Sequence, residues 1–217
     1  MTIFPEDARP NFVIASLHEM WFLAKYAVNY RKVDKNIWGP TPGNGILGIG
    51  AAILLFSIID TMGSMFRGNK EFSIPIDGRN VPITKTYQHF YILNSGYFGL
   101  GLSKVDLDKI YQSIRSTLVH NSMIPAGVLL DPGEDERLPF KIGITAANEK
   151  LYIVNVIPLF HLTGSALSAF QNDFRNGVID LEKSIAYQEI MMKDVPTLFM
   201  AHEDGTLRVE IKEWILK

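Results

Sequence analysis

Arg115 and His120 are the two residues whose types and spacing are most suggestive of chemistry. They stand in the stretch DKIYQSIRSTLVHN, residues 108–121, with four residues between them. An imidazole can take up or release a proton near neutral pH. A guanidinium stays charged and binds phosphate or carboxylate oxygens with its fork of N–H donors. The pair therefore suits acid–base chemistry on an anionic substrate.

The spacing alone is weak support for a site, because short motifs of this kind also arise by chance. On an ideal α-helix, residues five positions apart are separated by about 140° and about 7.5 Å. We therefore expect Arg115 and His120 to diverge on a single straight helix. They would converge if the helix frays near Val119, or if a second copy of the helix covers its exposed side.

The helix that carries this pair has the strongest sequence signals in the chain. Ser103 followed by Asp106 resembles a capping box, which marks a helix start. An apolar series at helical spacing then follows, made of Leu107, Ile110, Tyr111, Ile114 and Leu118. Tyr111 precedes Arg115 by about one turn, and Ser116 precedes His120 by about one turn.

An apolar segment earlier in the chain, about residues 45–66, predicts a buried helix. Its uninterrupted apolar run, residues 46–59, has the length of a core helix and is too short for a membrane span. Asp60 follows directly and would be costly in a bilayer. A carboxylate on a helix that is otherwise buried needs a partner. Arg115 of the same chain is the first candidate.

The remaining pattern predicts one mainly helical domain over residues 1–217, with two small hairpins (α+β). Further helices are expected at about 11–32, 85–98, 163–177 and 178–193, and a loop at 124–139. The hairpins are expected at about 139–160, inserted in a bundle that spans about 11–195, and at about 196–217. A third hairpin within residues 67–85 is only weakly indicated, because Pro75 and Pro82 interrupt it.

Composition narrows the class of protein. The net charge is −2, so the whole chain lacks the basic surplus typical of proteins that coat nucleic acid. With no cysteine, thiolate metal sites and a cysteine nucleophile are excluded. The five histidines show no zinc-binding spacing. We expect a cytoplasmic protein without a signal peptide or membrane segment, with no metal and no cofactor.

The order of these segments resembles the HEPN superfamily of helical bundles. LLFSIIDTMGSMF lies on one buried helix, IYQSIRSTLVHN on a later one, and a hairpin and paired helices follow. The family signature is an arginine followed after four to six residues by a histidine, which Arg115 and His120 match. The resemblance covers about residues 11–195, and residues 107–121 carry its specific part. Family members commonly have Asn, Asp or His directly after the arginine, where this chain has Ser116.

The resemblance implies a metal-independent endoribonuclease that acts as a homodimer, often in defence or as a toxin. His120 would take the proton of a ribose 2′-hydroxyl, and Arg115 would stabilise charge on the phosphate. Ser116 or Asn121 would orient the imidazole or the phosphate, with Tyr111 and Asp60 in support.

Two alternatives stay open. The first is a non-catalytic HEPN-like dimer that binds RNA, a nucleotide or another partner. In the second, Arg115 and Asp60 are a structural pair, and His120 interacts favourably with the C-terminal end of its helix.

Overall fold

The computed structural model describes residues 9–39, 45–192, 199–201 and 207–209. Most of these residues are helical, and the mainly helical α+β class predicted from the sequence is confirmed. The α-helices are α1 (Arg9–Asn29), α2 (Lys35–Trp38), α3 (Gly48–Ser64), α4 (Lys104–Lys109), α5 (Ser116–Asn121), α6 (Val156–Arg175) and α7 (Ile185–Met192). Within the described ranges, η2 (Thr86–Asn94) and η4 (Leu181–Lys183) are 3-10 helices, and η3 (Ile110–Arg115) is a π-helical segment.

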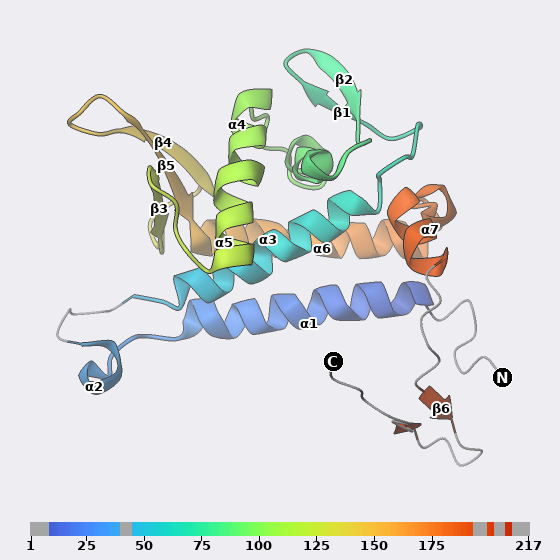
Figure 1. Ribbon diagram of the computed structural model, residues 1–217, viewed down its shortest axis with the longest axis horizontal. Coiled ribbons are helices and arrows are strands. Elements are labelled where there is room, and N and C mark those ends of the chain that lie inside the picture. The colour runs from blue at the N-terminus through green and yellow to red at the C-terminus, as the bar shows by residue number, and fades with distance from the viewer. Residues whose placement is uncertain (1–8, 40–44, 193–198, 202–206, 210–217) are drawn as a thin grey trace, which may run out of the picture.

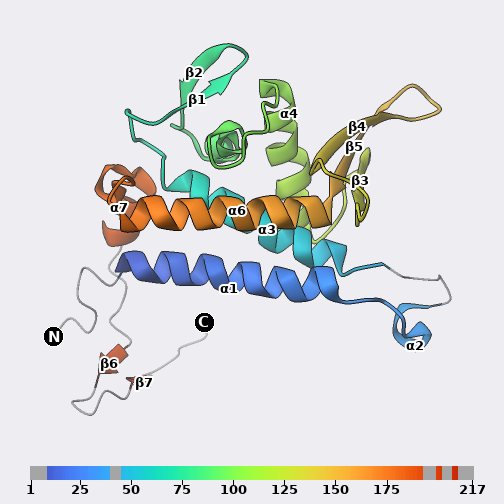
Figure 2. The same ribbon diagram turned by 180° about the vertical axis from the view of Figure 1, so that it is seen from behind.

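Helix α3 lies at the centre of the fold, as its apolar sequence predicts. Its side from Ala51 to Gly63 is buried where α1, α6, η2 and α5 pack against it, while residues on the opposite side, among them Asp60, are partly exposed (Figure 1). Seen from behind, α1 and α6 run alongside each other on one side of the molecule (Figure 2). Among the residues that the structure describes, no helix combines the length and the apolarity needed to cross a bilayer.

Helix α4, segment η3 and helix α5 form one continuous helix over residues 104–121. It begins where the sequence predicts: the Ser103 side chain accepts a hydrogen bond from the backbone N–H of Asp106. It ends at Ser122, whose left-handed backbone (φ 52°) stops the helical ladder. The C-terminal end of this helix packs on α3. His120 therefore lies in the last turn of a helix that is attached to the core.

The segment predicted as a helix at 85–98 is instead the 3-10 helix η2, which covers residues 86–94. All its residues from Gln88 to Asn94 are buried, which explains the poor amphipathic pattern there. Gly63 of α3 lies against the backbone of His89, so that a Cβ on Gly63 would stand 2.1 Å from the His89 carbonyl oxygen. Only glycine allows α3 and η2 to approach this closely.

Small sheets decorate the helices. The strands are β1 (Ser73–Ile76), β2 (Arg79–Pro82), β3 (Val128–Asp131), β4 (Phe140–Ile144), β5 (Lys150–Asn155), β6 (Phe199–Ala201) and β7 (Leu207–Val209). The predicted inserted hairpin is the antiparallel pair β4–β5, and the predicted C-terminal hairpin is β6–β7. The weakly indicated hairpin is present as β1–β2.

Three sequence predictions about element bounds were wrong. The segment predicted as a loop at 124–139 contains β3, which pairs in parallel with β5 to make a three-stranded sheet. Helix α6 begins at Val156, well before the predicted residue 163, because Pro158 falls in its first turn, where no backbone donor is needed. The helix predicted at 178–193 is divided, since Asp180 caps the short η4 and α7 starts only at Ile185.

Candidate functional site

The Arg115 guanidinium binds the Asp60 carboxylate, and this contact connects the α4–α5 helix to α3. Its Nη2 atom donates to Asp60 Oδ2. Both side chains are only 15% exposed, so each charge is largely removed from water and depends on the other. The pairing inferred from the single carboxylate on a buried helix is thus present within one chain.

Arg115 and His120 are in direct contact. Arg115 Nη1 lies 3.1 Å from Nε2 of His120. We expected the two to diverge on one straight helix, and this was wrong. The long arginine side chain reaches along the helix to the exposed imidazole, while α5 continues unfrayed through Val119 to Asn121. No second copy of the helix is needed to bring the two groups together.

The direction of this hydrogen bond defines the state of the imidazole. A guanidinium nitrogen can only donate, so His120 Nε2 must carry no proton when it accepts from Arg115. The His120 side chain is otherwise exposed at the end of α5. In this contact the Nε2 lone pair accepts from the Arg115 N–H, beside a fixed positive charge.

Tyr111 lies against the Arg115 guanidinium from the preceding turn. The guanidinium carbon is 5.4 Å from the centre of the Tyr111 ring, a cation–π arrangement. Burial, with the Asp60 carboxylate as a smaller contribution, raises the pKa of Tyr111, although Arg115 lowers it. The phenol therefore stays protonated at neutral pH and acts as a support for Arg115 rather than as a base.

His89 is a member of the site that the sequence analysis did not select. Its Nδ1 lies 2.9 Å from Asp60 Oδ1, on the carboxylate oxygen that Arg115 leaves free. The His89 side chain is 6% exposed. The only signal in the sequence was the unmatched charge of Asp60, which needs more than one partner when it is buried. The four side chains form a chain of contacts in the order His89, Asp60, Arg115 and His120.

Ser116 and Asn121 are near the pair but have no orienting contact to it. The Ser116 hydroxyl donates to the backbone carbonyl of Tyr111, 3.1 Å away. The same carbonyl accepts the Ser116 backbone N–H, which is the i→i+5 bond of the π turn. Asn121 is exposed at the end of α5. Neither side chain has a hydrogen bond to Arg115 or His120 among the described residues, and the orienting role expected for one of them stays a prediction.

The site offers no set of ligands for a metal ion. Across the described ranges, no group of three or more His, Asp or Glu side chains is placed to hold one. Within the site itself, the Asp60 oxygens are already bound by His89 and Arg115. The chemistry open to these residues is proton transfer by an imidazole and charge stabilisation by a guanidinium.

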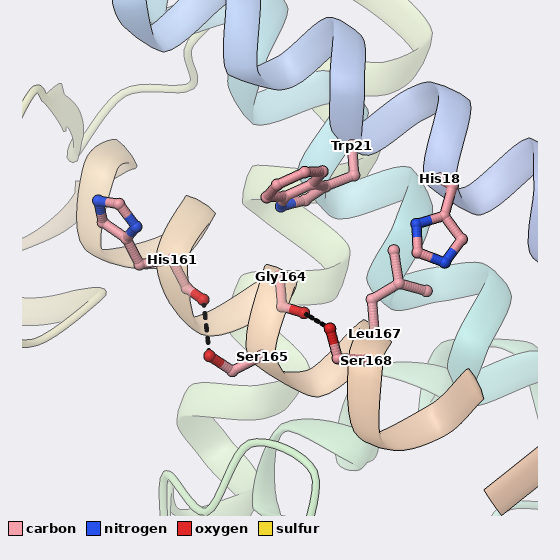
Figure 3. Close-up of a pocket in the computed structure, with 7 residues that line it drawn as sticks. All are labelled: His18, Trp21, His161, Gly164, Ser165, Leu167 and Ser168. Atoms are coloured by element: carbon pink, nitrogen blue, oxygen red, sulfur yellow. Dashed lines mark hydrogen bonds between the residues drawn. The ribbon is translucent and has the colours of Figure 1, made fainter. Parts of the chain in front are cut away.

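A separate cleft of about 310 Å³ lies between α1 and α6 (Figure 3). Its lining residues are His18, Trp21, His161, Gly164, Ser165, Leu167 and Ser168. Both serine hydroxyls donate to carbonyls of their own helix, to His161 and Gly164 respectively. Since those bonds are the ordinary ones of serine in a helix, the cleft shows no activated nucleophile.

Comparisons with known proteins assign no family. No family model matches the chain, and no curated protein or solved structure matches it either.

Proposed function

We propose that the protein is a HEPN-like, metal-independent endoribonuclease with Arg115 and His120 as its catalytic residues. The observation that supports it most is the 3.1 Å contact between Arg115 Nη1 and His120 Nε2 at the exposed end of α5. The contact places a candidate base one hydrogen bond away from a fixed cation. Cleavage of a phosphodiester beside a hydroxyl uses a base to take the hydroxyl proton and a cation to stabilise charge on the phosphate.

The proposed reaction uses two proton transfers and one displacement. The RNA phosphate accepts a hydrogen bond from Arg115 Nη1, which frees Nε2 of His120. Nε2 then removes the proton of the ribose 2′-hydroxyl, and the 2′ oxygen attacks the adjacent phosphorus. The bond to the 5′ oxygen breaks, and that oxygen takes a proton from water. The products are a 2′,3′-cyclic phosphate and a 5′-hydroxyl end.

Three features of the surroundings support this use of Arg115. Asp60 and the Tyr111 ring hold the guanidinium from two sides, which pre-organises its remaining donors. The π turn ends at Arg115, and single π turns occur frequently at functional sites.

From the family resemblance we also propose a homodimer, in which the exposed His120 of each chain faces the partner helix.

A second candidate function is a non-catalytic dimer that binds RNA or a nucleotide. The hydroxyl of Ser116 donates to the helix backbone, where many family members have a polar side chain that can orient the reacting groups. In addition, Asp60 offsets the Arg115 charge. An arginine held in this way would still bind a phosphate through Nη1.

One experiment separates the two functions. A mixed pool of structured and unstructured RNA is incubated with the protein in chelator, and both retention and new ends are measured. The catalytic proposal expects new ends that carry 2′,3′-cyclic phosphate. Retention without cleavage supports the binding function, whereas ends with a 3′-hydroxyl contradict the proposed chemistry.

A further inference from the structure

His89 binds the part of Asp60 that Arg115 does not. A carboxylate side chain has two rotatable bonds, and one contact leaves it free to turn about that contact. Asp60 is bound at both oxygens, by His89 at Oδ1 and by Arg115 at Oδ2. The orientation of the carboxylate is therefore fixed, and with it the position of Oδ2, the atom that accepts from Arg115 Nη2.

The position of His89 does not depend on Asp60, because the backbone around it is fixed by other contacts. Gly63 leaves no space between α3 and the His89 carbonyl. The Gln88 side-chain oxygen accepts from the backbone N–H groups of Thr84 and Lys85, at 2.8 and 2.9 Å, and so anchors the start of η2. His89 is thus the rigid end of the chain of contacts, and His120 is the exposed end.

Only one of the two ring nitrogens of His89 has a hydrogen-bond partner among the described residues. With Nδ1 donating to Asp60, the other ring nitrogen, Nε2, is buried and has no hydrogen-bond partner in the part of the chain that the structure describes. An unpaired buried polar atom is destabilising, and a leucine would fill much of the same space without one. The histidine brings a donor for Asp60, which a leucine lacks.

We propose that His89 is a positioning residue for RNA cleavage, which rests on the proposed function. Its Nδ1–H fixes Asp60, Asp60 fixes the Arg115 guanidinium, and Nη1 is thereby directed at the phosphate bound beside His120. His89 itself touches no reacting atom. Its effect is on the orientation of Arg115.

The test compares His89→Leu with His89→Asn. The asparagine amide places a donor close to the position of Nδ1, so the Asn variant keeps the contact with Asp60, whereas the leucine removes it. We expect kcat for RNA cleavage to fall about 10- to 100-fold in His89→Leu, with KM changed less than about threefold, because misplaced catalytic groups lower the rate of the chemical step. His89→Asn should retain most of the wild-type kcat. His18→Leu is the matched control, since His18 also bonds a side chain, Gln171, at 2.9 Å, but outside the site.

A second readout does not depend on RNA cleavage. The Nε–H group of Arg115 is buried and without a partner within the described residues. The NMR chemical shift of this nitrogen therefore depends on the position and surroundings of the guanidinium. We expect this resonance to shift or broaden in His89→Leu and to stay in place in His89→Asn and His18→Leu. If the wild type cleaves no RNA, the proposed function fails, while this resonance still tests the role of His89.

Two results overturn the positioning role. One is an unchanged Arg115 resonance in a folded His89→Leu variant. The other is a folded His89→Asn variant whose Arg115 resonance moves or whose cleavage is lost, because the donor alone would then not be what His89 contributes. The second result would overturn the positioning role even if His89→Leu does not fold.

Discussion

Gly63 of α3 and His89 of η2 are in backbone contact, and a Cβ on Gly63 would lie 2.1 Å from the carbonyl oxygen of His89. Real Cβ atoms are not found at this distance from backbone, so a side chain there must push η2 away from α3. Asp60 lies one turn before Gly63 on α3. The same close approach therefore brings the His89 ring within hydrogen-bonding distance of the Asp60 carboxylate.

The first prediction follows from that contact. Gly63→Ala should lower the free energy of unfolding by about 3 kcal/mol, as overpacking in a rigid core does. Gly50→Ala is the control on the same helix, because Gly50 has open space around it and alanine favours helices over glycine by about 0.5–1 kcal/mol. Urea unfolding of both variants measures the difference. A Gly63→Ala variant as stable as the wild type would contradict the close approach.

Arg115→Ala should affect folding and cleavage together. The Asp60 carboxylate would keep only His89 as a partner, and removing one member of a largely buried ion pair costs about 3 kcal/mol. Cleavage should also be lost, since the phosphate would meet no cation. Thermal and urea unfolding measure the first effect. An unchanged stability would show that Asp60 does not depend on Arg115.

Asp60→Asn should separate charge from shape. The amide has nearly the volume of the carboxylate but carries no charge, so Arg115 would lose its ion pair and keep its space. We expect a loss of stability of about 2 kcal/mol, of the size found for hydrogen bonds to charged groups, and a clear fall in cleavage. Asp108→Asn is a suitable control, because the Asp108 carboxylate is likewise bound by two side chains, those of Tyr91 and Lys104, but lies outside the site.

Tyr91 makes stability depend on pH in alkaline solution. Burial, together with its hydrogen bond to Asp108, raises the pKa of Tyr91 to about 12. The unfolded chain loses this proton at about pH 10, so it binds fewer protons than the folded protein between pH 10 and 12. The stabilisation is complete below pH 10 and is lost as the pH rises through that window. Unfolding of Tyr91→Phe should show a shallower decline there, and an equal decline would contradict the assignment.

The sequence predicted the structure correctly where a residue had few possible partners or positions. A single carboxylate on an apolar helix predicted an ion pair, and Arg115 was the correct partner. Ser103 and Asp106 predicted the start of the helix that carries the site. The buried central helix followed from an apolar run too short to span a membrane.

What the sequence missed depends on contacts between distant segments. The bond from His89 to Asp60 joins residues 29 positions apart, and no local pattern marks it. The parallel strand β3 is defined by its pairing with β5, not by its own residues. The contact between Arg115 and His120 depends on the reach of a long side chain, which the ideal angle between helix positions does not describe.

His120→Ala removes the proposed general base with little effect on the fold. His120 is exposed and contacts only Arg115 among the described side-chain hydrogen bonds, so its removal should change stability by no more than about 0.5 kcal/mol. The measurement is the rate of RNA cleavage in the presence of chelator, with wild type and His120→Ala compared at the same concentration of folded protein. We expect the wild type to cleave RNA in the presence of chelator and the variant to cleave none. Equal cleavage by both proteins, or none by the wild type, would contradict this expectation.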